Sequence, residues 1–373
     1  MTPTASHSAG HDSQPTGSTV DVRRRRLLPV IDGVRRRPLL FFFAGAYLLS
    51  AVALAVIGLP HPRGATNQHP ATSLIMFPVI VFGVGLLGVT LTAVTAGRPG
   101  LRELRARLSR PVPRRWWPVV LIPPAAILLV LSLLDTSSLP NYRPGFLPYG
   151  VAAGVTAGFV EELGWTGFAY PRLRGRLGPL AGALLLGGLW GLWHFPVVDS
   201  LGAASPHGAA WSAFFAAFVA VLVALRVLIA WVHCNTGSLR LAQALHGSST
   251  GFLVVLGAPA VTPRQEALWY AGYAGVLWLV VAVVLIRQGP TLGYHDPAPD
   301  REGQSGQSPR PTGERVSCAV RPLGRSRDPR RSSSTAHLLS TSPTHEAAIP
   351  IQRGQAPSMP FRWGSPLDAA WLH

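Results

Sequence analysis

Two adjacent glutamates, Glu161 and Glu162, lie inside an otherwise apolar stretch of this 373-residue chain. A carboxylate at bilayer depth costs about 3 kcal/mol on insertion scales, so ionisable residues in apolar spans are rare and by default mark a functional site. A carboxylate held in such a place can take a proton from water, which is how general-base hydrolysis begins. We therefore take this pair as the centre of the protein's chemistry.

Two histidines lie in separate apolar spans of similar character. His194 follows the run LLLGGLWGLW, and His246 follows SLRLAQAL. At 3.6 residues per turn, Trp190 shares a helix face with His194, and Thr250 shares one with His246. The pattern predicts that three helices direct carboxylate and imidazole groups into one interior cavity.

The elements that must position these residues are apolar spans. The chain is 48% hydrophobic and only 13% charged, which is unlike a soluble globular protein. We expect an all-α polytopic membrane protein with about eight transmembrane helices and with catalytic residues on helices 4, 5 and 7. The expected spans are 38–60, 72–96, 116–134, 148–170, 179–198, 209–231, 239–257 and 267–286.

The basic residues indicate how these spans are oriented. The arginines gather in alternate connections, at 98–115 and 172–176 among others, as the positive-inside rule expects of cytoplasmic loops. All 33 basic residues are arginine, which with abundant alanine, glycine and proline suggests a high-GC bacterial gene. We therefore expect a multi-pass protein of the bacterial plasma membrane with both termini in the cytoplasm. A net charge of +17 would favour nucleic acid in a soluble protein. Arginines beside apolar spans fit anionic lipid instead, so we expect membrane lipid and no nucleic acid as a partner.

The residues around the carboxylates and histidines resemble the CPBP family of intramembrane proteases, which includes the CAAX prenyl endopeptidases and bacterial bacteriocin-processing and immunity proteins. Its pattern is two glutamates followed four residues later by arginine, an aromatic four residues before histidine, and a histidine four residues before asparagine. The flanking words Glu-Leu-Gly-Trp, Trp-His-Phe-Pro and Thr-Gly-Ser-Leu look like the bacterial branch. The matching positions are Glu161-Glu162 with Thr166, Trp190 with His194, and His246 with Thr250. Thr166 and Thr250 depart from the pattern, because they replace the arginine and the asparagine.

The resemblance implies an intramembrane endopeptidase that acts on a membrane-associated protein or peptide. Glu161 would be the base that activates water, with His246 assisting it and Glu162 orienting the pair. His194 and Thr250 would face the oxyanion that forms when water attacks the peptide carbonyl.

The domain organisation expected from these observations has four parts. Residues 1–37 are a disordered basic cytoplasmic arm, and 38–97 hold the first two transmembrane helices. Residues 98–287 are the CAAX-protease-like domain with helices 3 to 8. Residues 288–373 are rich in Pro, Ser, Arg and Gly and are expected to be a disordered cytoplasmic tail.

A metal is an alternative that the sequence leaves open. Glu161, His194 and His246 with an open fourth position would make a catalytic zinc set, although no His-Glu-x-x-His occurs on one helix. Water activated by glutamate alone suits the same residues equally well.

Other functions also remain open. The glutamates can be satisfied by helix–helix hydrogen bonds or by Arg226, and each histidine can be an interhelical donor. A degenerate family member would act as a membrane scaffold or a bacteriocin immunity factor, and Thr166 and Thr250 favour that alternative. A transporter would show two similar halves, and the sequence has no internal repeat.

Overall fold

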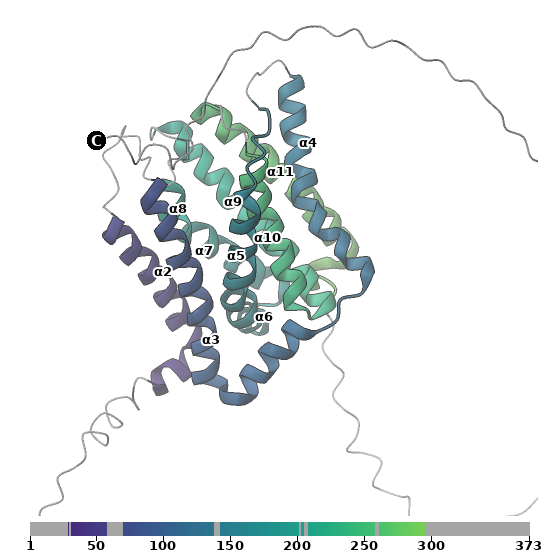
Figure 1. The fold of residues 1–373 in the computed structure, drawn as a ribbon. Coiled ribbons are helices and arrows are strands. Elements are labelled where there is room, and N and C mark those ends of the chain that lie inside the picture. Colours follow the sequence, from purple (N-terminus) through teal and green to yellow (C-terminus); the bar gives the residue numbers. More distant parts are fainter. Residues whose placement is uncertain are drawn as a thin grey trace, which may run out of the picture. The chain divides into compact units, whose positions relative to one another are not determined.

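The computed structural model of the protein describes residues 29, 31–57, 70–137, 142–200, 203–204, 208–257 and 261–294, and every regular element in them is a helix (Figure 1). The elements in chain order are α2 (Pro38–Ile57), α3 (Pro70–Ser109), η1 (Arg114–Leu121), α4 (Ile122–Thr136), α5 (Tyr149–Gly164), η2 (Trp165–Ala169), α6 (Tyr170–Leu177), α7 (Pro179–Trp193), α8 (Phe195–Ser200), α9 (Ala209–Thr236), α10 (Leu239–Val255), α11 (Pro263–Gln288) and η3 (Gly289–Thr291). Two of the short elements, η1 and η3, are 3₁₀-helices, whereas η2 is a π-helix.

The long helices have the length and composition of membrane spans. Five stretches of the described residues qualify on both grounds, namely Pro78–Ser109, Arg114–Thr136, Pro179–Asp199, Ala209–Thr236 and Pro263–Thr291. Large apolar side chains such as Leu86, Leu279 and Ile286 are exposed on them, as contact with lipid tails requires. The chain is thus an all-α polytopic membrane protein. The other three expected spans are also helical where the structure describes them, and the total of eight crossings remains a prediction.

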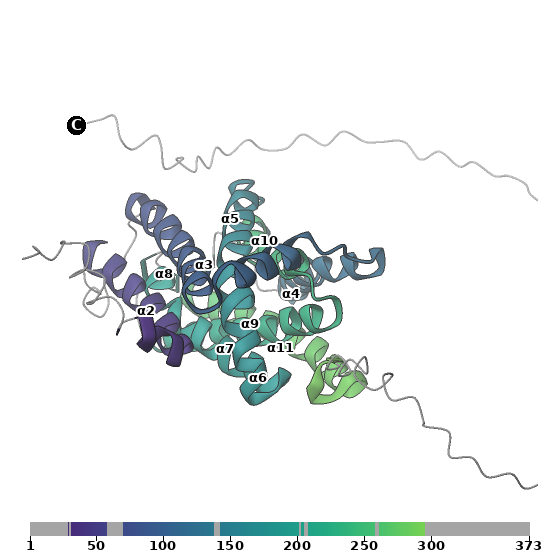
Figure 2. The same cartoon turned by 90° about the horizontal axis from the view of Figure 1, so that it is seen from below.

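Helices α5 and α10 lie side by side (Figures 1 and 2). Glycines line the contact between them. Gly154 and Gly158 of α5 face Gly247 and Gly251 of α10. A Cβ atom added to Gly158 would lie 2.6 Å from the Cα of Gly247, which is too close for two carbon atoms to pack. Gly158 precedes Glu162 by one turn, and Gly247 directly follows a candidate histidine of α10. The close approach of the backbones therefore brings these two polar side chains together.

Helix α9 packs against α7, α10 and α11 (Figure 2). Most residues of its second half are buried. Gly237 ends it in the left-handed conformation, with φ of 60°, where a side chain would be strained. Ser238 then caps α10 by accepting a hydrogen bond from the backbone N–H of Leu241. This two-residue connection holds the ends of α9 and α10 next to each other.

The arginine-rich segment after the second expected span is helical, although the sequence predicted a loop there. Gly97 has φ of 59° and ψ of −153°, so the chain turns at this residue and helix α3 resumes beyond it through Ser109. Glu103 and Arg107 form an ion pair one turn apart on this part of α3, with a nitrogen–oxygen distance of 2.9 Å. A segment with such pairing can be helical even though it is strongly charged.

The described parts of the basic arm and of the tail are folded against the helices. Residues 31–36 are helical, and Val34 is buried. After α11, Leu292 is fully buried and its carbonyl accepts a 2.8 Å hydrogen bond from the side chain of Asn235. An apolar anchor of this kind gave no periodic signal in the sequence. Residues 1–28 and 295–373 lie outside the described residues, and their disorder remains a prediction.

Candidate active site

Glu162 is fully buried near the end of α5, and both of its carboxylate oxygens are bound. Oε1 accepts hydrogen bonds from Arg226 Nη2 at 2.8 Å and from His246 Nδ1 at 2.9 Å. Oε2 accepts from Arg226 Nη1 at 3.0 Å and from the hydroxyl of Thr166. Because both oxygens are occupied, this carboxylate positions the side chains of Arg226, His246 and Thr166.

Arg226 reaches the site from α9 and is itself fully buried. Its guanidinium makes a two-pronged contact with Glu162, which is the strongest geometry for an arginine–carboxylate pair. The guanidinium carbon also lies 4.3 Å from the centre of the Trp190 ring. From the sequence, Arg226 was expected only as an alternative partner for the glutamates. Its signal was present, because a lone arginine in an apolar run marks a functional position.

Glu161 points to a different set of donors. Its Oε2 accepts the indole N–H of Trp165 at 3.0 Å and that of Trp190 at 3.2 Å. Both bonds go to one oxygen, so Oε1 has no hydrogen-bond partner among the described residues. The carboxylate is 2% exposed and is thus held by two donors in an apolar setting. It retains one oxygen with which to accept a proton.

His246 lies on α10 with its ring between Glu162 and Trp190. Because a carboxylate accepts hydrogen bonds, Nδ1 of His246 donates to Glu162, and Nε2 is directed away from that carboxylate. The ring centre is 4.8 Å from that of Trp190, edge to face. Glu162 therefore sets both the orientation and the tautomer of this imidazole.

His194 ends α7, and the short helix α8 begins at the next residue. Its Nδ1 lies 2.8 Å from the carbonyl oxygen of Trp190, so Nδ1 donates and Nε2 is directed elsewhere. Aromatic rings of Trp190, Trp193 and Phe218 surround it at centre-to-centre distances of 5.4, 5.0 and 5.5 Å. Nε2 can donate to an oxyanion only when the ring is doubly protonated.

Trp190 connects the candidate residues that the sequence placed on three helices. Its indole N–H binds Glu161, and its ring contacts those of His194 and His246. From the sequence, Trp190 was a helix-face neighbour of His194 and not a predicted site residue. In the structure, Trp190 contacts Glu161, His194 and His246.

The two threonines differ in their surroundings. Thr166 is buried in the carboxylate cluster, and its hydroxyl also lies 3.1 Å from Arg226 Nη1. Thr250 follows His246 by one turn and is partly exposed. No hydrogen bond joins Thr250 to the cluster within the described residues, so its role at an oxyanion stays a prediction.

The metal alternative requires Glu161, His194 and His246 to converge on one ion. Among the residues that the structure describes, no three His, Cys, Asp or Glu side chains gather closely enough to hold a metal ion. Trp190 stands between Glu161 and the two imidazole rings, because its indole N–H binds Glu161 and its ring contacts both histidines. As they stand, these side chains do not fit a metal centre.

Comparison with known proteins bears on this part of the chain. Residues 143–252 match the family described as Type II CAAX prenyl endopeptidase Rce1-like. The matched segment runs from just before α5 into α10, so it contains both carboxylates, both histidines and Thr250. The match supports the predicted resemblance to the CAAX endopeptidases, whereas assignment to the bacterial branch stays a prediction.

A relative of known name gives the same indication. The chain is 29% identical over 182 residues to CAAX prenyl protease 2 of the archaeon Methanococcus maripaludis. The aligned part covers 45% of this chain and 64% of that protein. The chain thus spans less than two thirds of the relative's length.

Proposed function

We propose that this protein is an intramembrane endopeptidase that hydrolyses a membrane-associated protein or peptide. The observation that carries the proposal is the difference in hydrogen bonding between the two buried carboxylates. Glu162 is saturated by Arg226, His246 and Thr166, whereas Glu161 is held through one oxygen only. Such a pair provides a positioning carboxylate and a base within one site.

In the proposed reaction, Oε1 of Glu161 takes a proton from a water molecule as the water oxygen attacks the peptide carbonyl carbon. The carbonyl oxygen becomes an oxyanion, which His194 and the hydroxyl of Thr250 face. The carbon–nitrogen bond then breaks, and the proton held by Glu161 passes to the leaving amine. His246, held by Glu162, supports this transfer through Nε2.

The proposed setting is the bacterial plasma membrane, with both termini in the cytoplasm. Arginine-rich ends such as Arg110 and Arg176 would lie against anionic headgroups. The archaeal relative is named a CAAX prenyl protease. For this chain we propose the broader substrate class of membrane-associated peptides.

The test is a comparison of new protein N-termini in membranes of cells that express the wild type, Glu161→Gln or Glu103→Gln. Glu103 is an exposed glutamate paired with Arg107, so Glu103→Gln is a matched control. We expect a defined set of new N-termini with the wild type and with Glu103→Gln that disappears with Glu161→Gln. Identical sets in all three samples would contradict proteolysis. That outcome would favour the alternative of a non-catalytic scaffold or immunity factor, which the threonines at 166 and 250 suggest.

A further inference from the structure

Several polar atoms around the carboxylate site are buried without a hydrogen-bond partner among the described residues. They are Nε of Arg226, both ring nitrogens of His233 and Oε1 of Gln243. The amide nitrogen of Gln243 is used, since it donates to the carbonyl of Phe159 at 2.6 Å. An unsatisfied buried polar atom costs about 1–3 kcal/mol, so in folded proteins such atoms are generally bound by internal water.

The strongest of these cases is His233, which is 5% exposed. It lies seven residues after Arg226 on α9, which is two helical turns, so the two side chains share a face and are about 10.5 Å apart along the axis. Because both unpaired polar groups lie on one face of one helix, we expect the same bound molecules to serve both of them. One water molecule cannot span that distance, so the bound molecules would be a short file of internal waters whose ends bind the two side chains.

The α5–α6 segment faces this side of α9 and carries polar groups next to Arg226 and next to His233. Thr166 lies 3.1 Å from Arg226 Nη1, and one turn later the ring of Tyr170 lies edge-on to His233, with ring centres 6.0 Å apart. Polar groups from Glu162 to Tyr170 thus flank the interval between α9 and the α5–α6 segment. On the facing side of α9, the residue between Arg226 and His233 is the small, buried Ala230.

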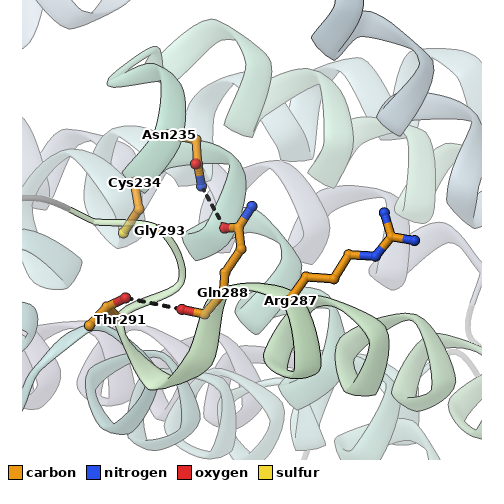
Figure 3. A pocket seen from close by; sticks show the side chains of 6 residues that line it. All are labelled: Cys234, Asn235, Arg287, Gln288, Thr291 and Gly293. Atoms are coloured by element: carbon orange, nitrogen blue, oxygen red, sulfur yellow. Dashed lines mark hydrogen bonds between the residues drawn. The ribbon is translucent and has the colours of Figure 1, made fainter.

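A pocket adjoins the far end of this interval (Figure 3). Its volume is about 550 Å³, and it is lined by Cys234, Asn235, Arg287, Gln288, Thr291 and Gly293. The hydroxyl of Tyr170 contacts the sulfur of Cys234 at 3.3 Å, so the pocket begins where the polar interval ends. Arg287 is exposed, and the ends of α9 and α11 that form the pocket lie on the predicted cytoplasmic side.

We propose that water enters the catalytic site from this pocket along the face of α9 that carries His233 and Arg226. The inference rests on the proposed function, because water is the second substrate of hydrolysis. It also meets a need of the geometry: Glu161 is 2% exposed and Glu162 is fully buried, so water has to reach them through the protein. His233 holds the water that links the pocket to Thr166 and Arg226.

The experiment is hydroxyl-radical footprinting of the purified full-length protein in lipid nanodiscs, without substrate. Radicals formed by brief X-ray irradiation mark side chains next to bound water, and mass spectrometry measures the rate at each residue. Trp190 and Tyr170 lie at the two ends of the route, whereas Trp269 and Tyr273 are comparably buried residues of α11. We expect Trp190 to react several-fold faster than Trp269, and Tyr170 several-fold faster than Tyr273.

Two variants locate the route. His233→Leu should reduce the rate at Trp190 to that of Trp269 and leave Tyr170, which adjoins the pocket, unchanged. His233→Gln should keep the wild-type rate at Trp190, because an amide can also hold water. Equal rates for Trp190 and Trp269 in the wild type would overturn the proposal, and that comparison needs no variant to fold. An unchanged Trp190 rate in His233→Leu would also overturn it, since water would then enter elsewhere.

The result is independent of proteolysis. A protein that cleaves nothing can still show the footprint, which would leave the water route intact and reject the endopeptidase. Cleavage by a protein whose Trp190 is unreactive would reject the route alone.

Discussion

The hydroxyl of Thr166 and the guanidinium of Arg226 lie 3.1 Å apart, and both bind the same oxygen of Glu162. Thr166 occupies the position at which the family pattern has an arginine, one turn after the glutamates. In this chain an arginine reaches that carboxylate from α9 instead. The departure at Thr166 therefore does not leave the buried carboxylate without a cation.

This arrangement predicts that an arginine at 166 can replace the one at 226. Arg226→Leu should lower stability by about 3–5 kcal/mol, because it leaves Glu162 buried without its cation. Adding Thr166→Arg to that variant should recover much of the loss, since residue 166 already points at Glu162. The measurement is the midpoint of thermal unfolding in detergent. Thr166→Arg alone should destabilise the protein by crowding two cations together, and a double variant no better than Arg226→Leu would contradict the exchange.

The two glutamates should respond differently to the same substitution. Glu161→Gln should abolish cleavage with little change in stability, because an amide oxygen can still accept both indole N–H groups. Glu162→Gln should lower the thermal midpoint markedly, because Arg226 then lacks its counter-charge. The two quantities are read from an unfolding curve and a cleavage assay on the same preparation. Equal thermal shifts for the two variants would show that the pairing has been misassigned.

The glycine contact between α5 and α10 should tolerate no added carbon. A Cβ atom at residue 154 would lie 2.6 Å from the Cα of Gly251, so Gly154→Ala must push the helices apart. We expect a loss of about 1–3 kcal/mol from overpacking and a disturbed site. Gly188 of α7 is the matched control, because an added Cβ atom there meets nothing within 4 Å. Gly188→Ala should be neutral or slightly stabilising in the same unfolding assay.

Thr250 tests the oxyanion assignment. Loss of one oxyanion donor costs about 10²- to 10³-fold in turnover. Thr250→Val should therefore reduce cleavage of an identified substrate, and Thr250→Asn should raise it by placing an amide donor on a longer side chain. The double variant Thr250→Asn with Glu161→Gln should stay inactive, because an oxyanion donor cannot replace the base. Unchanged cleavage by Thr250→Val would make Thr250 an ordinary helix residue.

The arginine distribution predicts the membrane topology. Reporter domains fused after Arg110 or Arg176 should be active in the cytoplasm, and those fused after Asn141 or His207 should be active outside. A swapped pattern would reverse the orientation of every helix. The water route would then open on the outer side of the membrane.

The sequence predicted the helical spans well because their signal is local. An apolar run of membrane length is helical wherever its neighbours lie, so the expected segments and the observed helices agree to within a few residues at most ends. The improbable residues were found in the same way, since Glu161, Glu162 and His246 stood out against apolar surroundings. Their meeting in one cluster agrees with the expected convergence of helices.

The pairing within the cluster was not predictable from local patterns. Whether His246 binds Glu161 or Glu162 depends on the rotation of α5 against α10, which the glycine contact determines. The two bonds from Arg226 depend likewise on how α9 is rotated about its axis. The turn at Gly289–Thr291 was missed because a stabilising contact next to it, the hydrogen bond from Asn235 to Leu292, comes from a distant segment. The helix beyond Gly97 was missed because its many arginines suggested a loop, although the pairing of Glu103 with Arg107 is local.

The π-helical turn at Trp165–Ala169 carries a consequence for the design of variants. A π-turn holds one residue more than the α-helical path between the same two points. Deleting Gly167 should therefore convert the turn into plain α-helix and leave Glu161, Glu162 and Tyr170 close to their present places. A deletion from the regular α-helix on either side has no extra residue to absorb it and would rotate everything beyond it by about 100°. The π-turn is thus a point at which the chain between the two carboxylates and α6 can lose a residue and keep its register.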